Sequence, residues 1–74
     1  MKELVEYIAK NLVNHPEDVR VDQSGTRVVR LRLRVHPDDM GKVIGREGRI
    51  AQAIRTLLKI VAARTGRRIE LDIG

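Results

Sequence analysis

The strongest constraint on the fold is a strict alternation of apolar and basic residues between positions 29 and 36. Successive side chains of a β-strand point to opposite faces, so a period of two predicts a strand with one buried and one exposed face. The apolar set is Val29, Leu31, Leu33 and Val35, and the basic set is Arg30, Arg32, Arg34 and His36. A sheet built around this strand must have its apolar face covered by other elements.

The basic side chains of this strand allow two interpretations. Arginines can line a surface for a polyanion, or they can form a solvated face whose charges are balanced by neighbouring strands. Acidic residues in the flanking segments, Asp22, Glu70 and Asp72, favour the solvated face. Whether Arg30, Arg32 and Arg34 contact a partner or only solvent is left open by the sequence.

The segments before this strand predict one helix and one further strand. Apolar residues at helical spacing predict an amphipathic helix over residues 1–13, which ends before Pro16 because the residue preceding a proline is driven out of the helical region. Alternation over residues 19–22, followed by turn residues 23–26, predicts a strand that forms a hairpin with the basic one.

The segments after it predict two helices and a closing strand. Pro37 starts a short helix, and Asp38 and Asp39 are expected to cap it at the positive end of its dipole. A longer helix runs from about residue 48 to about residue 65, with Gly66 as its C-terminal cap, and alternation over residues 69–73 predicts the last strand. The order of elements is αββααβ.

This order predicts an α+β fold with a three-stranded mixed sheet covered on one face by three helices. The strands over residues 29–35 and 69–73 are joined through two helices, so they can lie parallel by a right-handed crossover. The whole chain, residues 1–74, is read as one domain without linker or repeat.

Composition excludes several classes of function. The chain has no cysteine, and its only histidines are His15 and His36, so we expect no disulfide, no metal site, no cofactor and no catalytic residues. No apolar run is long enough to span a bilayer and no secretory signal is present, so we expect a cytoplasmic protein. A net charge of +5 suits a polyanionic partner.

The motif with functional meaning is Gly45-Arg46-Glu47-Gly48, which joins the two predicted helices. Glycine lets a sugar-phosphate chain approach the backbone without a Cβ in the way, and a helix N-terminus attracts phosphate. Lys42, Arg46 and Arg49 surround the loop with positive charge, while Glu47 is expected to point into solvent. A GxxG sequence alone could be a tight helix–helix turn, but neither the dinucleotide fingerprint nor the P-loop pattern fits.

With this context, VIGREGRI within an αββααβ order resembles a type II KH domain, and the resemblance spans residues 1–74. The small stand-alone bacterial RNA-binding proteins of the KhpA (YlqC-like) family are the most similar group. The resemblance implies a groove for about four unpaired nucleotides whose backbone is held by the GxxG loop. It also implies a helical wall that includes Ile44 and Ala51, and a short variable loop over residues 65–68 in which Arg67 and Arg68 add phosphate contacts.

The resemblance implies partners as well as a site. These are single-stranded RNA and a second KH domain, either in a homodimer or with a KhpB (Jag, EloR) type protein. We expect an RNA-binding protein of low sequence specificity, in post-transcriptional regulation or as an RNA chaperone within ribonucleoprotein particles. The alternative is a dimerisation or scaffold module with weak RNA contact. An enzyme is not expected.

Overall fold

The computed structural model describes all 74 residues and confirms the α+β fold with the predicted order of elements. Helix α1 spans Lys2–Leu12, and strands β1 (Arg20–Ser24) and β2 (Val28–Arg34) follow it. Helices α2 (Met40–Ile44) and α3 (Arg49–Thr65) come next, and strand β3 (Arg68–Ile73) closes the chain. Short 3-10 turns cover Pro16–Asp18, Pro37–Asp39 and Arg46–Gly48.

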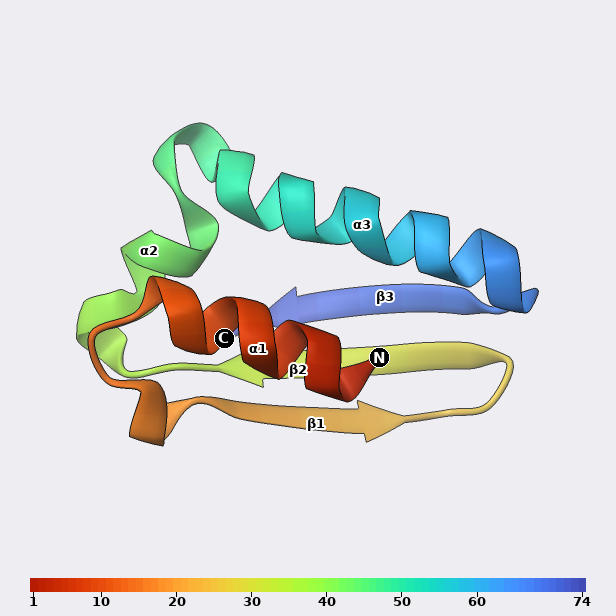
Figure 1. The fold of residues 1–74 in the computed structure, drawn as a ribbon, viewed down its shortest axis with the longest axis horizontal. Coiled ribbons are helices and arrows are strands. Elements are labelled where there is room, and N and C mark those ends of the chain that lie inside the picture. Colours follow the sequence, from red (N-terminus) through yellow and green to blue (C-terminus); the bar gives the residue numbers. More distant parts are fainter.

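The sheet has the predicted mixed topology, with β2 in the centre. Strand β1 pairs with β2 in antiparallel register, with Val21 opposite Leu33. Strand β3 pairs with β2 in parallel register, with Leu31 opposite Leu71. Helix α1 lies over the sheet and α3 runs along β3, while the loop between α2 and α3 protrudes at one end of the molecule (Figure 1).

The hydrophobic core lies between this sheet and the helices, as the alternation in β2 predicts. Val29, Leu31 and Leu33 are at most 1% exposed, and they pack with buried apolar residues of every helix and both other strands. These contributions are Val5 and Ala9 from α1, Val43 from α2, Ile54 and Leu58 from α3, Val21 from β1 and Leu71 from β3. No helix is long and apolar enough to cross a membrane.

Asp39 departs from the prediction that it caps the short helix. Its carboxylate is fully buried and accepts hydrogen bonds from the backbone N–H groups of Asn14 (3.3 Å) and His15 (3.0 Å). The same carboxylate bonds Nδ1 of His15 at 3.0 Å and Nζ of Lys42 at 3.3 Å. The cap role at this helix start falls instead to His36, whose Nδ1 accepts from the N–H of Asp38 at 3.0 Å. Sequence spacing could not reveal this, because the donors of Asn14 and His15 are 24 to 25 residues away.

The Asp39 carboxylate therefore ties the connection between α1 and β1 to the start of α2. Burial raises the pKa of Asp39, but the hydrogen bonds from His15, Asn14 and Lys42 outweigh burial and lower that pKa to about 2. The hydrogen bond to Asp39 raises the pKa of His15, against a smaller opposing effect of burial. The His15 ring also stacks on that of His36, with ring centres 4.0 Å apart.

We expect replacement of Asp39 by asparagine to lower stability in a pH-dependent way. The lowered pKa of Asp39 gives stability that is present above its ordinary pKa of 3.8 and lost as pH falls toward 2. The raised pKa of His15 gives stability that is present below its ordinary pKa of 6.5 and lost as pH rises through the folded-state pKa. The difference in urea midpoint between wild type and Asp39→Asn should thus be largest between pH 3.8 and 6.5.

Asp38→Asn is the matched control, because it removes the same charge from an adjacent carboxylate whose side chain is 79% exposed. Urea unfolding at a series of pH values, followed by circular dichroism, measures both variants. A loss of stability for Asp39→Asn that stays constant with pH would contradict the importance of the ion pair with His15.

Candidate nucleic-acid interface

The loop Gly45-Arg46-Glu47-Gly48 is the most unusual stretch of backbone in the molecule. Gly45, Glu47 and Gly48 all have positive φ angles, of 77°, 58° and 74°. The N–H of Gly48 donates to the carbonyl of Gly45 at 3.1 Å, which closes a tight turn between α2 and α3. Glu47 is the only non-glycine residue of the chain with a positive φ.

The two glycines of this loop meet different constraints. A Cβ built on Gly45 would lie 2.6 Å from Cγ1 of Ile50 and 2.9 Å from the backbone nitrogen of Ile50, so the position has no room for a side chain. A Cβ built on Gly48 would meet nothing within 4 Å. Gly45 thus lets the chain fold back on α3, whereas Gly48 leaves open space beside the start of that helix.

The start of α3 is available to an anion. Gly48 occupies the N-cap position, and no side chain caps it. The positive end of the dipole of a 17-residue helix therefore faces the open space beside the loop. This is the role predicted for the glycine at position 48.

The charged residues predicted around the loop differ in whether they are free or paired with another charge. Arg46 is exposed and makes no ion pair, so it is free to contact an anion. Glu47 points into solvent as predicted, with 73% of its side chain exposed, and it pairs with Arg49 at 3.5 Å. Lys42 is held by the buried carboxylate of Asp39 instead of standing free beside the loop.

The residues predicted for the groove wall lie at the end of α2 and the start of α3, and those predicted for the variable loop lie at the end of α3. Ile44 is half-buried against the core and Ala51 is only 3% exposed, so little of either is accessible. Helix α3 continues to Thr65 and β3 begins at Arg68, so the variable loop consists of only two residues, Gly66 and Arg67. Arg67 and Arg68 lie at the far end of α3, about 25 Å from the GxxG loop for a helix of this length (Figure 1).

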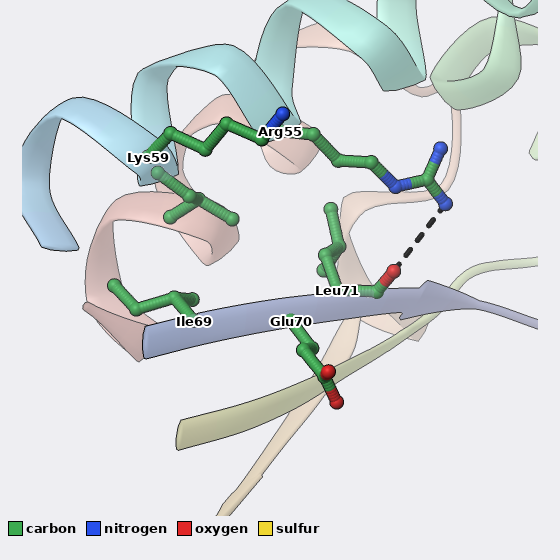
Figure 2. A pocket seen from close by; sticks show the side chains of 6 residues that line it. Arg55, Lys59, Ile69, Glu70 and Leu71 are labelled. Carbon is green, nitrogen blue, oxygen red and sulfur yellow. Dashed lines mark hydrogen bonds between the residues drawn. The ribbon is translucent and has the colours of Figure 1, made fainter. Parts of the chain in front are cut away.

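Between these two ends lies a groove whose lining residues sequence reasoning did not identify. It has a volume of about 240 Å³ and is formed by one flank of α3 and the edge strand β3 (Figure 2). Leu58, Ile69 and Leu71 give it an apolar floor, and Arg55 and Lys59 extend from α3 above the strand. The last lining residue is Glu70, which points away on the other side of β3 (Figure 2).

The groove opens along the free edge of β3. The N–H groups of Arg68 and Gly74 donate to the carbonyls of Arg27 and Leu33, so the backbone N–H and C=O groups of the even-numbered residues of β3 point toward β2. Alternate residues of a strand face opposite neighbours, so the backbone groups of Ile69, Leu71 and Ile73 point toward the groove side. Arg55 donates to the carbonyl of Leu71 at 3.3 Å, as the dashed line in Figure 2 shows. The other edge groups remain available for hydrogen bonds with a ligand.

The arrangement is suited to a linear polyanion. A positively charged turn, an apolar groove with a polar strand edge and two further arginines follow one another along α3. No group of three or more histidine, aspartate or glutamate residues could hold a metal ion. The groove could have been foreseen from the alternation in 69–73 and the basic flank of α3, but its width depends on how α3 sits on the sheet.

Comparison with known proteins gives one consistent family. The profile of the KH domain of KhpA/KhpB matches residues 2–73. The chain is 53% identical to the RNA-binding protein KhpA of Clostridium perfringens, over 99% of both chains. It is 51% identical to the RNA-binding protein KhpA of Halalkalibacterium halodurans, with 99% of this chain and 97% of the relative covered. The protein of that name from Aquifex aeolicus is 45% identical, over 99% of this chain and 94% of the relative.

Paired glycine substitutions test the loop geometry. Gly45→Ala and Gly48→Ala both place a Cβ at a positive φ, which destabilises by about 1 kcal/mol. Gly45→Ala adds the clash with Ile50, for which overpacking predicts a further loss of about 1 to 3 kcal/mol. Urea unfolding should therefore show a clearly larger loss of free energy for Gly45→Ala. Equal losses for the two variants would mean that Ile50 moves aside freely.

Proposed function

This chain belongs to the KhpA/KhpB family of KH-domain proteins, and on that premise we propose that it binds single-stranded RNA through the loop 45–48 and the groove beside α3. The observation that carries the proposal is the loop itself. It combines two glycines with positive φ, the uncapped N-terminus of α3 and the unpaired guanidinium of Arg46. The family is non-enzymatic and its members named above are RNA-binding proteins, so the chain is not an enzyme.

In this proposal the sugar-phosphate backbone lies against the loop. A phosphate beside Gly48 meets the N-terminus of α3 and the guanidinium of Arg46, and the open space beside Gly48 lets it approach closely. Glu47 faces solvent, so its charge does not enter the contact. Arg49 can exchange its exposed ion pair with Glu47 for a phosphate, because such surface pairs contribute little to stability.

The bases then extend into the groove. Arg55 lies about two turns along α3 from Gly48, roughly 10.5 Å away, so nucleotides held at the loop can place their bases over Leu58, Ile69 and Leu71. About four nucleotides reach from the loop toward Arg67 and Arg68. Tyr7, the only aromatic residue of the chain, lies on α1 and offers no stacking platform there. We therefore propose low sequence specificity, suited to post-transcriptional regulation or an RNA chaperone role in the cytoplasm.

The charge-reversed loop variant tests this proposal. Arg46→Asp with Glu47→Asp keeps both glycines and replaces the free cation by an anion, so it should abolish binding of short unstructured RNA and leave the fold intact. For wild type, each phosphate contact should contribute about 0.7 to the salt slope of binding. Fluorescence anisotropy at several salt concentrations measures both quantities.

Lys10→Asp is the matched control, since it makes the same change of net charge on the exposed surface of α1. This variant should bind RNA nearly as well as wild type. Equal weakening by the loop variant and by Lys10→Asp would show that only net charge matters, and unchanged binding in the loop variant would remove the loop as the site.

A second candidate function, pairing with another KH domain, is favoured by an apolar stripe on α3. Ile50, Ala53, Leu57 and Ile60 repeat at intervals of three and four residues along one flank of this helix. Leu57 is 48% and Ile60 is 51% exposed, although both are large and apolar. Such a stripe is typical of a helix that packs against a partner helix. We propose that a second copy of this chain, or a KhpB-type KH protein, covers it.

Ile60→Glu tests this pairing, because a buried charge at a helix–helix contact is strongly unfavourable. If the chain self-associates through the stripe, sedimentation should show a dimer for wild type and a monomer for Ile60→Glu. Gln52→Glu, which adds the same charge to another exposed position of α3, should leave the mass unchanged. A wild-type monomer would leave only a different KH protein as the partner, and a dimeric Ile60→Glu variant would exclude the stripe.

A further inference from the structure

The face of the sheet opposite the helices is open and rich in arginine. The register of the strands places the even-numbered residues of all three strands on this face, because the odd-numbered ones point into the core. Its charged residues are Arg20 and Asp22 on β1, Arg30, Arg32 and Arg34 on β2, and Arg68, Glu70 and Asp72 on β3. All of them are exposed. The face is turned away from the reader in Figure 1, where α1 lies in front of the strands.

The carboxylates on this face do not neutralise the arginines. Five arginines stand against three carboxylates, and the only ion pair among them joins Arg30 to Glu70 at 3.3 Å. Asp22 and Asp72 lie in register on either side of Arg32. The surplus of positive charge is thus carried by the arginines whose register partners are not acidic.

The surplus is concentrated where Arg20 of β1 lies directly opposite Arg34 of β2. Like charges at directly opposed positions of an antiparallel pair are destabilising. Arg20 is nevertheless fixed in place, because its Nη1 donates to the carbonyls of Glu17 and Val19, both at 2.9 Å. An oriented guanidinium beside a second one forms a site whose repulsion an anion would relieve.

We propose that this arginine face, centred on Arg20 and Arg34, binds the phosphates of an RNA segment that extends beyond the groove. The inference rests on the proposed function for the identity of the polyanion. Arg20 and Arg34 lie directly opposite each other on neighbouring strands, so their Cβ atoms are about 5 Å apart and both guanidinium groups can contact one RNA strand. A flat, exposed arginine row contacts the backbone without reading the bases.

RNA fits this face better than a membrane or a protein. The face presents no exposed large apolar side chain, so it lacks the apolar centre of a protein interface and anything that would insert into lipid. An RNA strand held in the groove also brings its remaining nucleotides close to the sheet, since the molecule measures only 35 by 23 by 17 Å. Tethering of this kind makes a second, weak contact effective.

The experiment compares two RNA lengths in two variants. Wild type, Arg20→Gln with Arg34→Gln, and the control Lys2→Gln with Lys10→Gln are titrated by anisotropy with an unstructured RNA of about four nucleotides, which fills only the groove. The same proteins are titrated with an RNA of about 20 nucleotides, which exceeds one site. Both variants lower the net charge equally, and the control lysines are exposed on α1.

We expect the Arg20/Arg34 variant to bind the short RNA like wild type and to bind the long RNA more weakly. Its salt slope for the long RNA should fall by about 1.4, or about 0.7 for each of two phosphate contacts. The lysine control should show neither change. Unfolding in urea checks that the Arg20/Arg34 variant is folded.

The outcomes separate this inference from the proposed function. A long-RNA slope equal to that of the lysine control would overturn the arginine face and leave the groove intact. Retention on vesicles of anionic phospholipid that depends on Arg20 and Arg34, without any effect on RNA, would likewise overturn it in favour of a lipid surface. Failure of wild type to bind either RNA would overturn the proposed function and this inference together.

Discussion

The whole structure depends on the alternation of side chains in the central strand β2. Val29, Leu31 and Leu33 point to one side and form the middle of a core to which every helix contributes. Arg30, Arg32 and Arg34 point to the other side and keep that face in water. Because the helices can cover only the apolar side, the GxxG loop and the groove are confined to one layer and the arginine face to the other.

The buried carboxylate of Asp39 connects this core to the loop. It holds the backbone of Asn14 and His15 on one side and Lys42 of α2 on the other, so α2 leaves the sheet in a fixed direction. A buried carboxylate is tolerated only when its oxygens are hydrogen-bonded, and no buried side-chain polar atom of the molecule lacks a partner. The five-residue helix α2 is too short to be stable alone, and this tie together with Val43 holds it in place.

The sequence was sufficient to predict the fold because its periodicities agree with the topology. The helix and strand boundaries follow from apolar spacing, prolines and glycines, and the mixed sheet follows from the order of elements. It was insufficient wherever a contact joins distant segments. The hydrogen-bond partners of Asp39, including Lys42, depend on how the helices and strands pack together. The groove between α3 and β3 depends on the same packing. The like-charge pair of Arg20 and Arg34 became visible only with the strand register.

The loop is the one place where local preference and observed structure disagree. Gly45 at φ 77° and ψ 172° occupies a region open to glycine alone, and Glu47 adopts a left-handed conformation that side chains other than Asn and Asp rarely take. Strained backbone of this kind persists only when its surroundings hold it, as Ile50 and the hydrogen bond from Gly48 to Gly45 do here, and it is found preferentially at binding sites. The strain therefore points to the same four residues as their charge and their position at the start of α3.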